Sequence, residues 1–205
     1  MELIIDNKDK NKNDIVIGTF NEEKNIEKFV SYYKNFNIII FDDNSKDKTI
    51  EIAKKLGCTV YLRNRLNEPK SIGPTEYAVS NYLENYSQNR VVIKLDIDEF
   101  IDKDFLKILE SLNEKSNLNF VKERVEIIFG KKIKLFKSEQ PLLIKKNKFI
   151  YDPLSLHRAL KFSENLKYKN LIPVYHTGHP KGINKIIKIL KYIDVEKDEC
   201  RKKNN

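Results

Sequence analysis

The sequence has few of the residues that hold small secreted proteins together or bind zinc. It contains two cysteines, Cys58 and Cys200, no tryptophan and one methionine among 205 residues. Two cysteines so far apart provide neither a disulfide framework nor a zinc motif, which suits a reducing compartment. No apolar run approaches the roughly 18 residues that a membrane span needs, and residues 1–14 lack the apolar core of a secretion signal. We therefore expect a cytoplasmic protein.

Acidic residues are outnumbered, with 39 basic and 30 acidic side chains giving a formal charge of +9. Such a charge attracts nucleic acid, acidic lipid or phosphorylated small molecules, and it does not select among them. The hydrophobic fraction of 40% is enough for the core of one large domain. Residues 7–14 and 196–205 are polar runs that we expect to fray.

The first half of the chain alternates strand-length apolar runs with helical stripes. The runs lie at residues 15–19, 38–41, 59–62 and 91–95, and the stripes lie at residues 26–33, 50–56, 79–86 and 105–112. This alternation predicts an α/β fold with a mostly parallel, Rossmann-like sheet and flanking helices. Runs at 120–129, 132–137 and 142–146 predict a β-rich second half.

Hydrogen-bonding and acidic side chains follow three of the predicted strands. The segments are Thr19-Phe20-Asn21-Glu22, Asp42-Asp43-Asn44-Ser45 and Asp96-Ile97-Asp98-Glu99. Ligands of open α/β sheets bind beyond the carboxyl ends of the strands. We therefore expect the three segments to line one crevice.

Asp96 and Asp98 are two residues apart, a spacing that puts both carboxylates on one side of an extended segment. They could share a hard divalent cation such as Mg²⁺ or Mn²⁺, which would bridge them to a diphosphate. The alternative is an acidic loop that caps the next helix through Asp102.

The second and third strand ends carry further candidates for ligand binding. Asp42 and Asp43 could accept hydrogen bonds from a base or a ribose, or they could be purely structural, with Ser45 or Asp47 capping a helix. After the third strand, Arg63, Arg65 and Lys70 could bind the donor phosphates or an anionic acceptor, or form a solvated loop.

Taken together over roughly residues 14–105, the three motifs resemble those of the GT-A glycosyltransferases of family 2. The resemblance implies one GT-A domain over residues 1–205, with a nucleotide-sugar-binding half (14–105), an acceptor-side half (106–195) and a flexible tail (196–205). The implied activity is metal-dependent transfer of a sugar from a UDP- or GDP-sugar to an acceptor hydroxyl, with inversion.

The second half is similar to the lipopolysaccharide-core branch of these enzymes through Arg124, Gly130-Lys131-Lys132, Leu156-His157 and Val174-Tyr175-His176. The resemblance implies two sets of binding residues. The nucleoside set is Phe20, Asn21, Glu22 and Asp43, and the set for the diphosphate and its Mn²⁺ or Mg²⁺ is Asp96, Asp98 and His176. From their places after the strands, Thr19, Asp42 and Lys70 complete the expected donor site.

The general base is left open because the sequence departs from that branch. Arg158 follows His157 where the branch has a glutamate. An inverting transfer needs a carboxylate near the acceptor hydroxyl. Asp152 is our first choice, and Glu126 and Glu99 are the alternatives.

Several partners remain open at the level of sequence. The acceptor could be a glycan, a lipid-linked sugar or a protein. Residues 183–193 predict a helix with lysines on one face and Ile186, Ile187 and Leu190 on the other, which could rest on the cytoplasmic face of a membrane or pack on the domain.

Two other functions fit parts of the sequence. A sugar-phosphate nucleotidyltransferase would need a glycine-rich loop after the first strand, where only Gly18 occurs. A degenerate glycosyltransferase, or a basic module that binds nucleic acid, would suit the net charge. No nucleic-acid motif accompanies that charge, so we expect no specific nucleic-acid partner.

Overall fold

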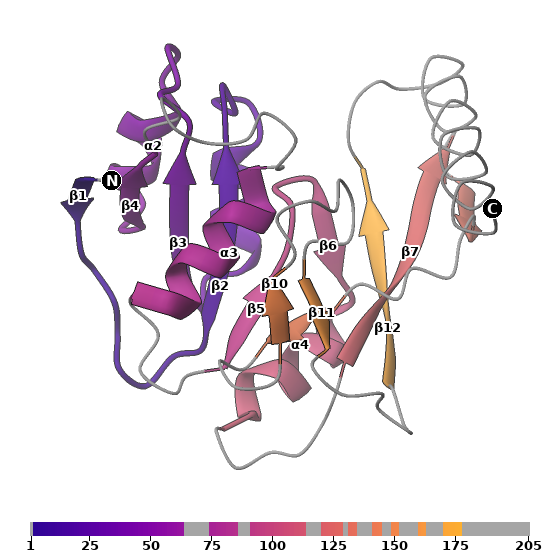
Figure 1. Cartoon of the computed structure of the whole chain (residues 1–205). Helices are drawn as coiled ribbons and strands as arrows, with labels where there is room; N and C mark the ends of the chain where they lie inside the picture. Colours follow the sequence, from indigo (N-terminus) through magenta and orange to yellow (C-terminus); the bar gives the residue numbers. More distant parts are fainter. Residues whose placement is uncertain are drawn as a thin grey trace, which may run out of the picture.

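The computed structural model describes residues 2–63, 74–85, 91–113, 120–128, 131–134, 141–144, 149–151, 160–162 and 170–177. These residues form two larger β-sheets with helices around them (Figure 1). The first sheet carries the first half of the chain, and the second sheet is built mainly from the second half.

The first sheet has six strands in the order β1-β4-β3-β2-β5-β9. The four inner strands run parallel, and the two edge strands run antiparallel to their neighbours. Their bounds are β1 Glu2–Ile5, β4 Thr59–Leu62, β3 Asn37–Asp42, β2 Asp14–Thr19, β5 Val92–Lys94 and β9 Leu143–Ile144. The expected α/β fold with a mostly parallel sheet is confirmed.

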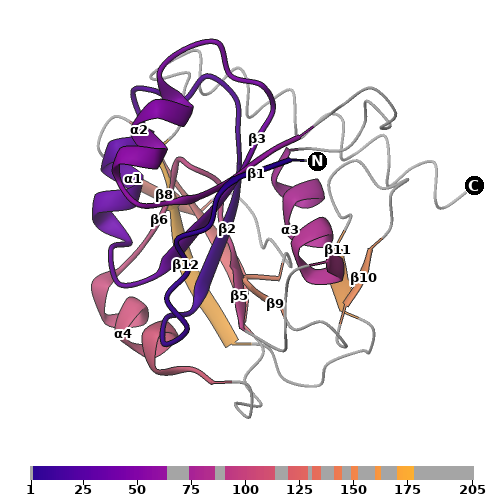
Figure 2. The same cartoon turned by 90° about the vertical axis from the view of Figure 1, so that its left-hand side faces the viewer.

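Helices cover both faces of this sheet (Figure 2). One face packs against α1 (Ile26–Tyr32), α2 (Thr49–Lys55) and α4 (Lys103–Ser111), and the other face packs against α3 (Pro74–Asn85). Along β2, Ile15 and Ile17 belong to the first core and Val16 to the second. Burial on both faces explains why these strands are continuous apolar runs in the sequence.

The second sheet has the strand order β6-β12-β7-β8. Its strands are β6 (Glu99–Ile101), β12 (Asn170–His176), β7 (Phe120–Ile128) and β8 (Lys131–Lys134). β12 lies between its neighbours, parallel to β7 and antiparallel to β6. The hairpin of β10 (Phe149–Tyr151) and β11 (Leu160–Phe162) is separate. The β-rich second half is therefore confirmed.

The expectation that residues 7–14 fray is wrong. Asp14 is fully buried at the start of β2, where its carboxylate accepts hydrogen bonds from the Tyr82 hydroxyl at 2.5 Å and the Asn37 side chain at 2.8 Å. The backbone amide of Asp9 donates to Asn37 Oδ1 at 2.9 Å. Partners distant in sequence satisfy these polar groups, so polarity alone did not indicate disorder.

Two expectations concern residues outside the described ranges, namely the helix at 183–193 and the tail at 196–205. Within the described part of the chain, no helix combines the length and apolar character needed to cross a membrane.

Candidate active site

The register of the first sheet brings the first two motifs together. Thr19 at the end of β2 pairs with Asp42 at the end of β3, and its hydroxyl donates a 2.7 Å hydrogen bond to Asp42 Oδ2. Asp42 is fully buried. Its carboxylate also accepts hydrogen bonds from the backbone amide and the hydroxyl of Ser45, both at 2.7 Å. These contacts shape the loop after β3.

The loops after β2 and β3 are joined through Asn21, which has a φ of 56°. Its backbone amide donates to Ser45 Oγ at 2.8 Å, and its side-chain oxygen accepts from the Lys46 amide at 2.8 Å. Asparagine tolerates the left-handed region better than most residues, which suits it to this turn. Of the two predicted caps of α2, Asp47 serves as one: Lys48 directly precedes the helix and makes no cap hydrogen bond, but Asp47 Oδ1 accepts from the Thr49 amide at 3.0 Å.

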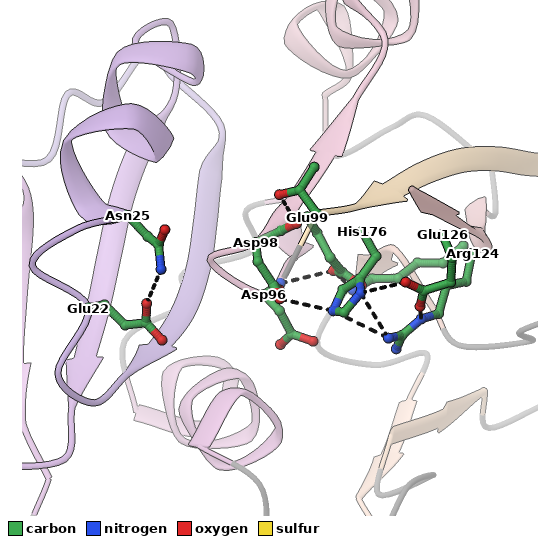
Figure 3. A network of polar contacts seen from close by, with 10 residues as sticks. Glu22, Asn25, Asp96, Asp98, Glu99, Arg124, Glu126 and His176 are labelled. Atoms are coloured by element: carbon green, nitrogen blue, oxygen red, sulfur yellow. Dashed lines mark hydrogen bonds and ion pairs between the residues drawn. The ribbon is translucent and has the colours of Figure 1, made fainter. Parts of the chain in front are cut away.

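Two more predicted donor-binding residues lie beside Asn21. Phe20 is 53% exposed. The Glu22 amide donates to Thr49 Oγ1 at 2.7 Å, and the Glu22 carboxylate accepts from the Asn25 side chain at 2.7 Å (Figure 3). The structure therefore brings Thr19, Phe20, Asn21, Glu22 and Asp42 to one edge of the sheet.

Asp43 is buried in an ion pair with Arg63, whose Nη1 lies 3.2 Å from Asp43 Oδ1. The side chains are 1% and 2% exposed, respectively. Of the two alternatives for Arg63, the solvated loop is therefore wrong, because Arg63 compensates the charge of a buried carboxylate. Arg65 and Lys70 lie outside the described residues.

The Asp96–Glu99 segment is a tight turn between β5 and β6, so the expectation that Asp96 and Asp98 lie on one side of an extended segment is wrong. The Glu99 amide donates to the Asp96 carbonyl at 3.0 Å, and the Thr177 amide donates to the Asp98 carbonyl at 2.9 Å. Asp102 occupies the N-cap position of α4 but makes no cap hydrogen bond through its side chain. Its carboxylate instead accepts from the Tyr175 hydroxyl at 2.7 Å.

The register of the second sheet aligns Glu99, His176 and Glu126 in one row across β6, β12 and β7. Residues paired in this way project to the same face of a sheet. His176 Nε2 lies 3.0 Å from Asp98 Oδ2, and His176 Nδ1 lies 3.0 Å from Glu126 Oε2 (Figure 3). The structure thus brings Asp98 and His176 together.

Arg124 adds a positive charge to this cluster. Its Nε donates to Glu126 Oε1 at 2.6 Å, and its Nη2 lies 3.1 Å from His176 Nδ1. Burial lowers the pKa of Arg124, but the negative charges of Glu126, Glu99 and Asp96 raise it by more. The net effect is a raised pKa. The Asp96 charge therefore acts at the same cluster. Burial also lowers the pKa of His176, but hydrogen bonds to Asp98 and Glu126 raise it above 6.5 overall.

The three residues predicted to bind a metal, Asp96, Asp98 and His176, all border this cluster. Asp98 contacts His176 directly, whereas the connection of Asp96 is the effect of its charge on Arg124. In the ranges that the structure describes, no group of three or more histidine, cysteine or acidic side chains is already arranged to hold a metal ion.

The candidates for the general base differ in their surroundings. Asp152, His157 and His179 lie outside the described residues. Glu99 is buried in an ion pair with Lys122, and Glu126 is buried against Arg124 and His176. We did not single out Lys122 from the sequence. A sequence signal for it exists, because charged residues occupy every second position of this strand and therefore share one face of the sheet. These residues are Lys122, Arg124 and Glu126.

Comparison with known proteins places the chain in a family. The model of the family described as "Glycosyl transferase family 2" matches residues 14–185. The chain therefore belongs to glycosyl transferase family 2, and the resemblance based on the three motifs is confirmed at that level. The lipopolysaccharide-core branch stays a prediction. No curated protein matches the chain.

One solved structure shows the same fold at low sequence identity. TarS 1–349 of S. aureus is 15% identical, with a TM-score of 0.54 over 81% of this chain and 60% of that chain. This chain thus spans less than two thirds of TarS. Glucosyl-3-phosphoglycerate synthase from Mycobacterium tuberculosis, solved with Mn²⁺, UDP and glucosyl-3-phosphoglycerate, is 20% identical. Its TM-score is 0.40 over 55% of this chain and 44% of that chain.

Proposed function

We propose that this chain transfers a sugar from a UDP- or GDP-sugar to an acceptor hydroxyl. The observation that carries the proposal is the 3.0 Å contact between Asp98 and His176 at the carboxyl ends of the parallel strands, next to the loops that contain the first two motifs. Membership of glycosyl transferase family 2 supports sugar transfer as the reaction.

The nucleoside would bind at the joined loops after β2 and β3. Phe20 offers an exposed ring, and Asn21 and Glu22 offer polar groups beside it. Asp43, also predicted to bind the donor, is buried against Arg63 and would support the loop after β3 from behind. Thr19 and Asp42 hold the two loops together through their buried hydrogen bond. The excess of basic residues would attract the diphosphate to the protein.

The side chains at the cluster fit a divalent cation of the Mn²⁺ or Mg²⁺ type. Asp98 offers oxygen and His176 offers Nε2, while Asp96 could supply a second carboxylate and the diphosphate the remaining ligands. Glu126 lies on the other ring nitrogen, as the carboxylate partner of a metal-binding histidine commonly does. When bound, the cation would neutralise the diphosphate leaving group.

The acceptor hydroxyl needs a base on the face of the sugar opposite the leaving group. Glu99 and Glu126 are both buried and ion-paired, which leaves neither carboxylate free to reach an acceptor. We therefore keep Asp152 as the proposed base, and the reaction would invert the anomeric centre.

A hydrolysis screen tests the proposal without knowledge of the acceptor. UDP- and GDP-sugars are incubated with the protein and Mn²⁺ or Mg²⁺, and the released nucleoside diphosphate is measured. We expect release from one donor class and its loss with EDTA. If no donor is hydrolysed and none raises the melting temperature, the proposal is wrong. Tight, base-specific oligonucleotide binding across a salt series would favour the nucleic-acid-binding alternative.

A further inference from the structure

Glu99 closes the turn that contains Asp96 and Asp98 in two ways. Its backbone amide donates to the Asp96 carbonyl at 3.0 Å. Its carboxylate Oε2 accepts a hydrogen bond from the Asp96 amide at 2.9 Å. The backbone hydrogen bond alone would be enough to form a turn. The additional contact fixes the peptide group that precedes the Asp96 side chain.

The charge of Glu99 is buried and is balanced by one lysine. Lys122 on β7 donates to Glu99 Oε2, and the two side chains are 2% and 4% exposed, respectively. Burying an ion pair carries a desolvation cost that a pair of apolar side chains would avoid. Such a pair at the base of the turn suggests a role in holding its geometry.

The backbone on either side of Glu99 is fixed as well. The Tyr33 hydroxyl donates to the Glu99 carbonyl at 3.0 Å and accepts from the Ile101 amide at 3.1 Å. At the other end of the turn, the Thr177 hydroxyl donates to the Asp98 carbonyl at 3.1 Å. Glu99 therefore holds the Asp96 amide in a turn whose other parts are held by Tyr33 and Thr177.

We infer that Glu99, paired with Lys122, is a positioning residue that orients the turn for cation and diphosphate binding, and that it is not the general base. The inference rests on the proposed function. It assigns Glu99 and Lys122 a role in binding, whereas a base would act on the acceptor in the chemical step.

The test compares Glu99→Gln, Lys122→Met and the double variant, with Glu51→Gln/Lys55→Met as the control. The control removes an exposed ion pair of 2.8 Å on α2. Three quantities are measured: the affinity for Mn²⁺ with UDP by calorimetry, kcat and KM of donor hydrolysis, and hydrogen exchange of the Asp96 amide by NMR. The amide measurement needs neither metal nor donor.

Each single variant should weaken Mn²⁺-dependent UDP binding about tenfold, as loss of a partner behind a metal ligand typically does. Asp96 amide exchange should also become faster, with kcat at saturation retained. In the double variant no charge is left unpaired, and a glutamine oxygen can still accept from the Asp96 amide. Its affinity should return to within about threefold of the wild type, as strong coupling between the two sites requires.

Three results would overturn the inference. One is a Glu99→Gln protein with normal affinity but a kcat reduced about 10²-fold or more, the behaviour of a general base. Another is wild-type affinity and wild-type Asp96 exchange in both single variants. The third is a double variant that folds, by circular dichroism, but does not recover. If a single variant does not fold, the affinity of the double variant for Mn²⁺ with UDP decides whether the inference holds.

Failure of the proposed function would be seen separately. Wild-type protein that binds neither UDP nor GDP with Mn²⁺ would remove the proposed function, and with it this inference. Wild-type protein that binds normally while the Glu99 variants match it would remove only the inference.

Discussion

The Nε2 atom of His176 lies 3.0 Å from Oδ2 of Asp98, so the two side chains share the space that a bound cation would enter. A cation that used both would have to replace the proton between them, because only neutral imidazole is a metal ligand. This relationship would tie the affinity for a metal ion to pH and to the charge of both side chains.

We expect UDP with Mn²⁺ to raise the melting temperature of the wild type by linkage. Asp98→Asn should abolish most of this rise, because a neutral amide binds a hard cation poorly. Differential scanning fluorimetry with and without Mn²⁺ measures the effect. The matched control is Asp104→Asn, which makes the same chemical change at a side chain 94% exposed on α4. A full metal-dependent shift in Asp98→Asn would contradict the metal assignment.

Mn²⁺ affinity should fall as pH decreases through the pKa of His176. That pKa is raised, since hydrogen bonds to Asp98 and Glu126 outweigh the lowering effect of burial. Below it, binding must displace about one proton, so log K should change by about one per pH unit. Calorimetric titrations at several pH values measure this slope. In His176→Asn the pH dependence that comes from the histidine proton should be absent, so the plot of log K against pH should be flatter. Equal slopes in the wild type and the variant would exclude His176 as a ligand.

The metal-free protein should show the opposite dependence in its stability. Because the folded pKa of His176 is raised above 6.5, its protonated form contributes stability that is fully present below pH 6.5. This contribution is lost as pH rises through the folded pKa. Urea unfolding should therefore show a stability difference between wild type and His176→Asn that becomes smaller with rising pH. A difference that grows with pH would contradict the assigned direction.

Tyr82→Phe should destabilise the fold by about 1–3 kcal/mol, the cost of removing one partner of a buried polar group. The Tyr82 hydroxyl donates to the fully buried carboxylate of Asp14 at 2.5 Å. Chemical denaturation measures the change. Tyr175→Phe is the matched control, because its hydroxyl bonds to Asp102 at an exposed position. Equal losses in the two variants would show that burial of the Asp14 contact does not set the cost.

Gly57→Ala should destabilise the protein by about 1–2 kcal/mol, the cost of a left-handed backbone for an ordinary residue. Gly57 follows α2 with a φ of 75°, and an added Cβ would meet no atom within 4 Å. The loss therefore comes from the backbone alone. Gly57→Asn should lose less in thermal unfolding, because asparagine adopts this region more readily. A larger loss for asparagine would point to packing instead.

The sequence predicted the first sheet well because its strands are buried on both faces and so form unbroken apolar runs. Helix α4 was also marked by a stripe of Phe105, Ile108, Leu109 and Leu112, but the stripe was partly misplaced, because Ile108 is exposed and Leu106 is buried. Strand β1 was missed because it is short and precedes a polar run. Strand β6 was missed because its three residues follow directly on the acidic turn.

The candidate site was predictable only in part. The three motifs follow strands, so the edge of the sheet where they meet could be deduced. The row of Glu99, His176 and Glu126 depends on strand register between distant segments, which no local pattern reveals. The same holds for Lys122 and Arg63, whose buried ion pairs are formed only after the chain folds.

The central place of β12 in the second sheet has a consequence for biosynthesis. It is the last described strand in the chain, yet it separates β6 from β7, both made much earlier. A nascent chain can fold its parallel sheet first, but His176 cannot meet Asp98 until this strand has left the ribosome and inserted. Donor and cation would therefore find no complete cleft on an unfinished polypeptide.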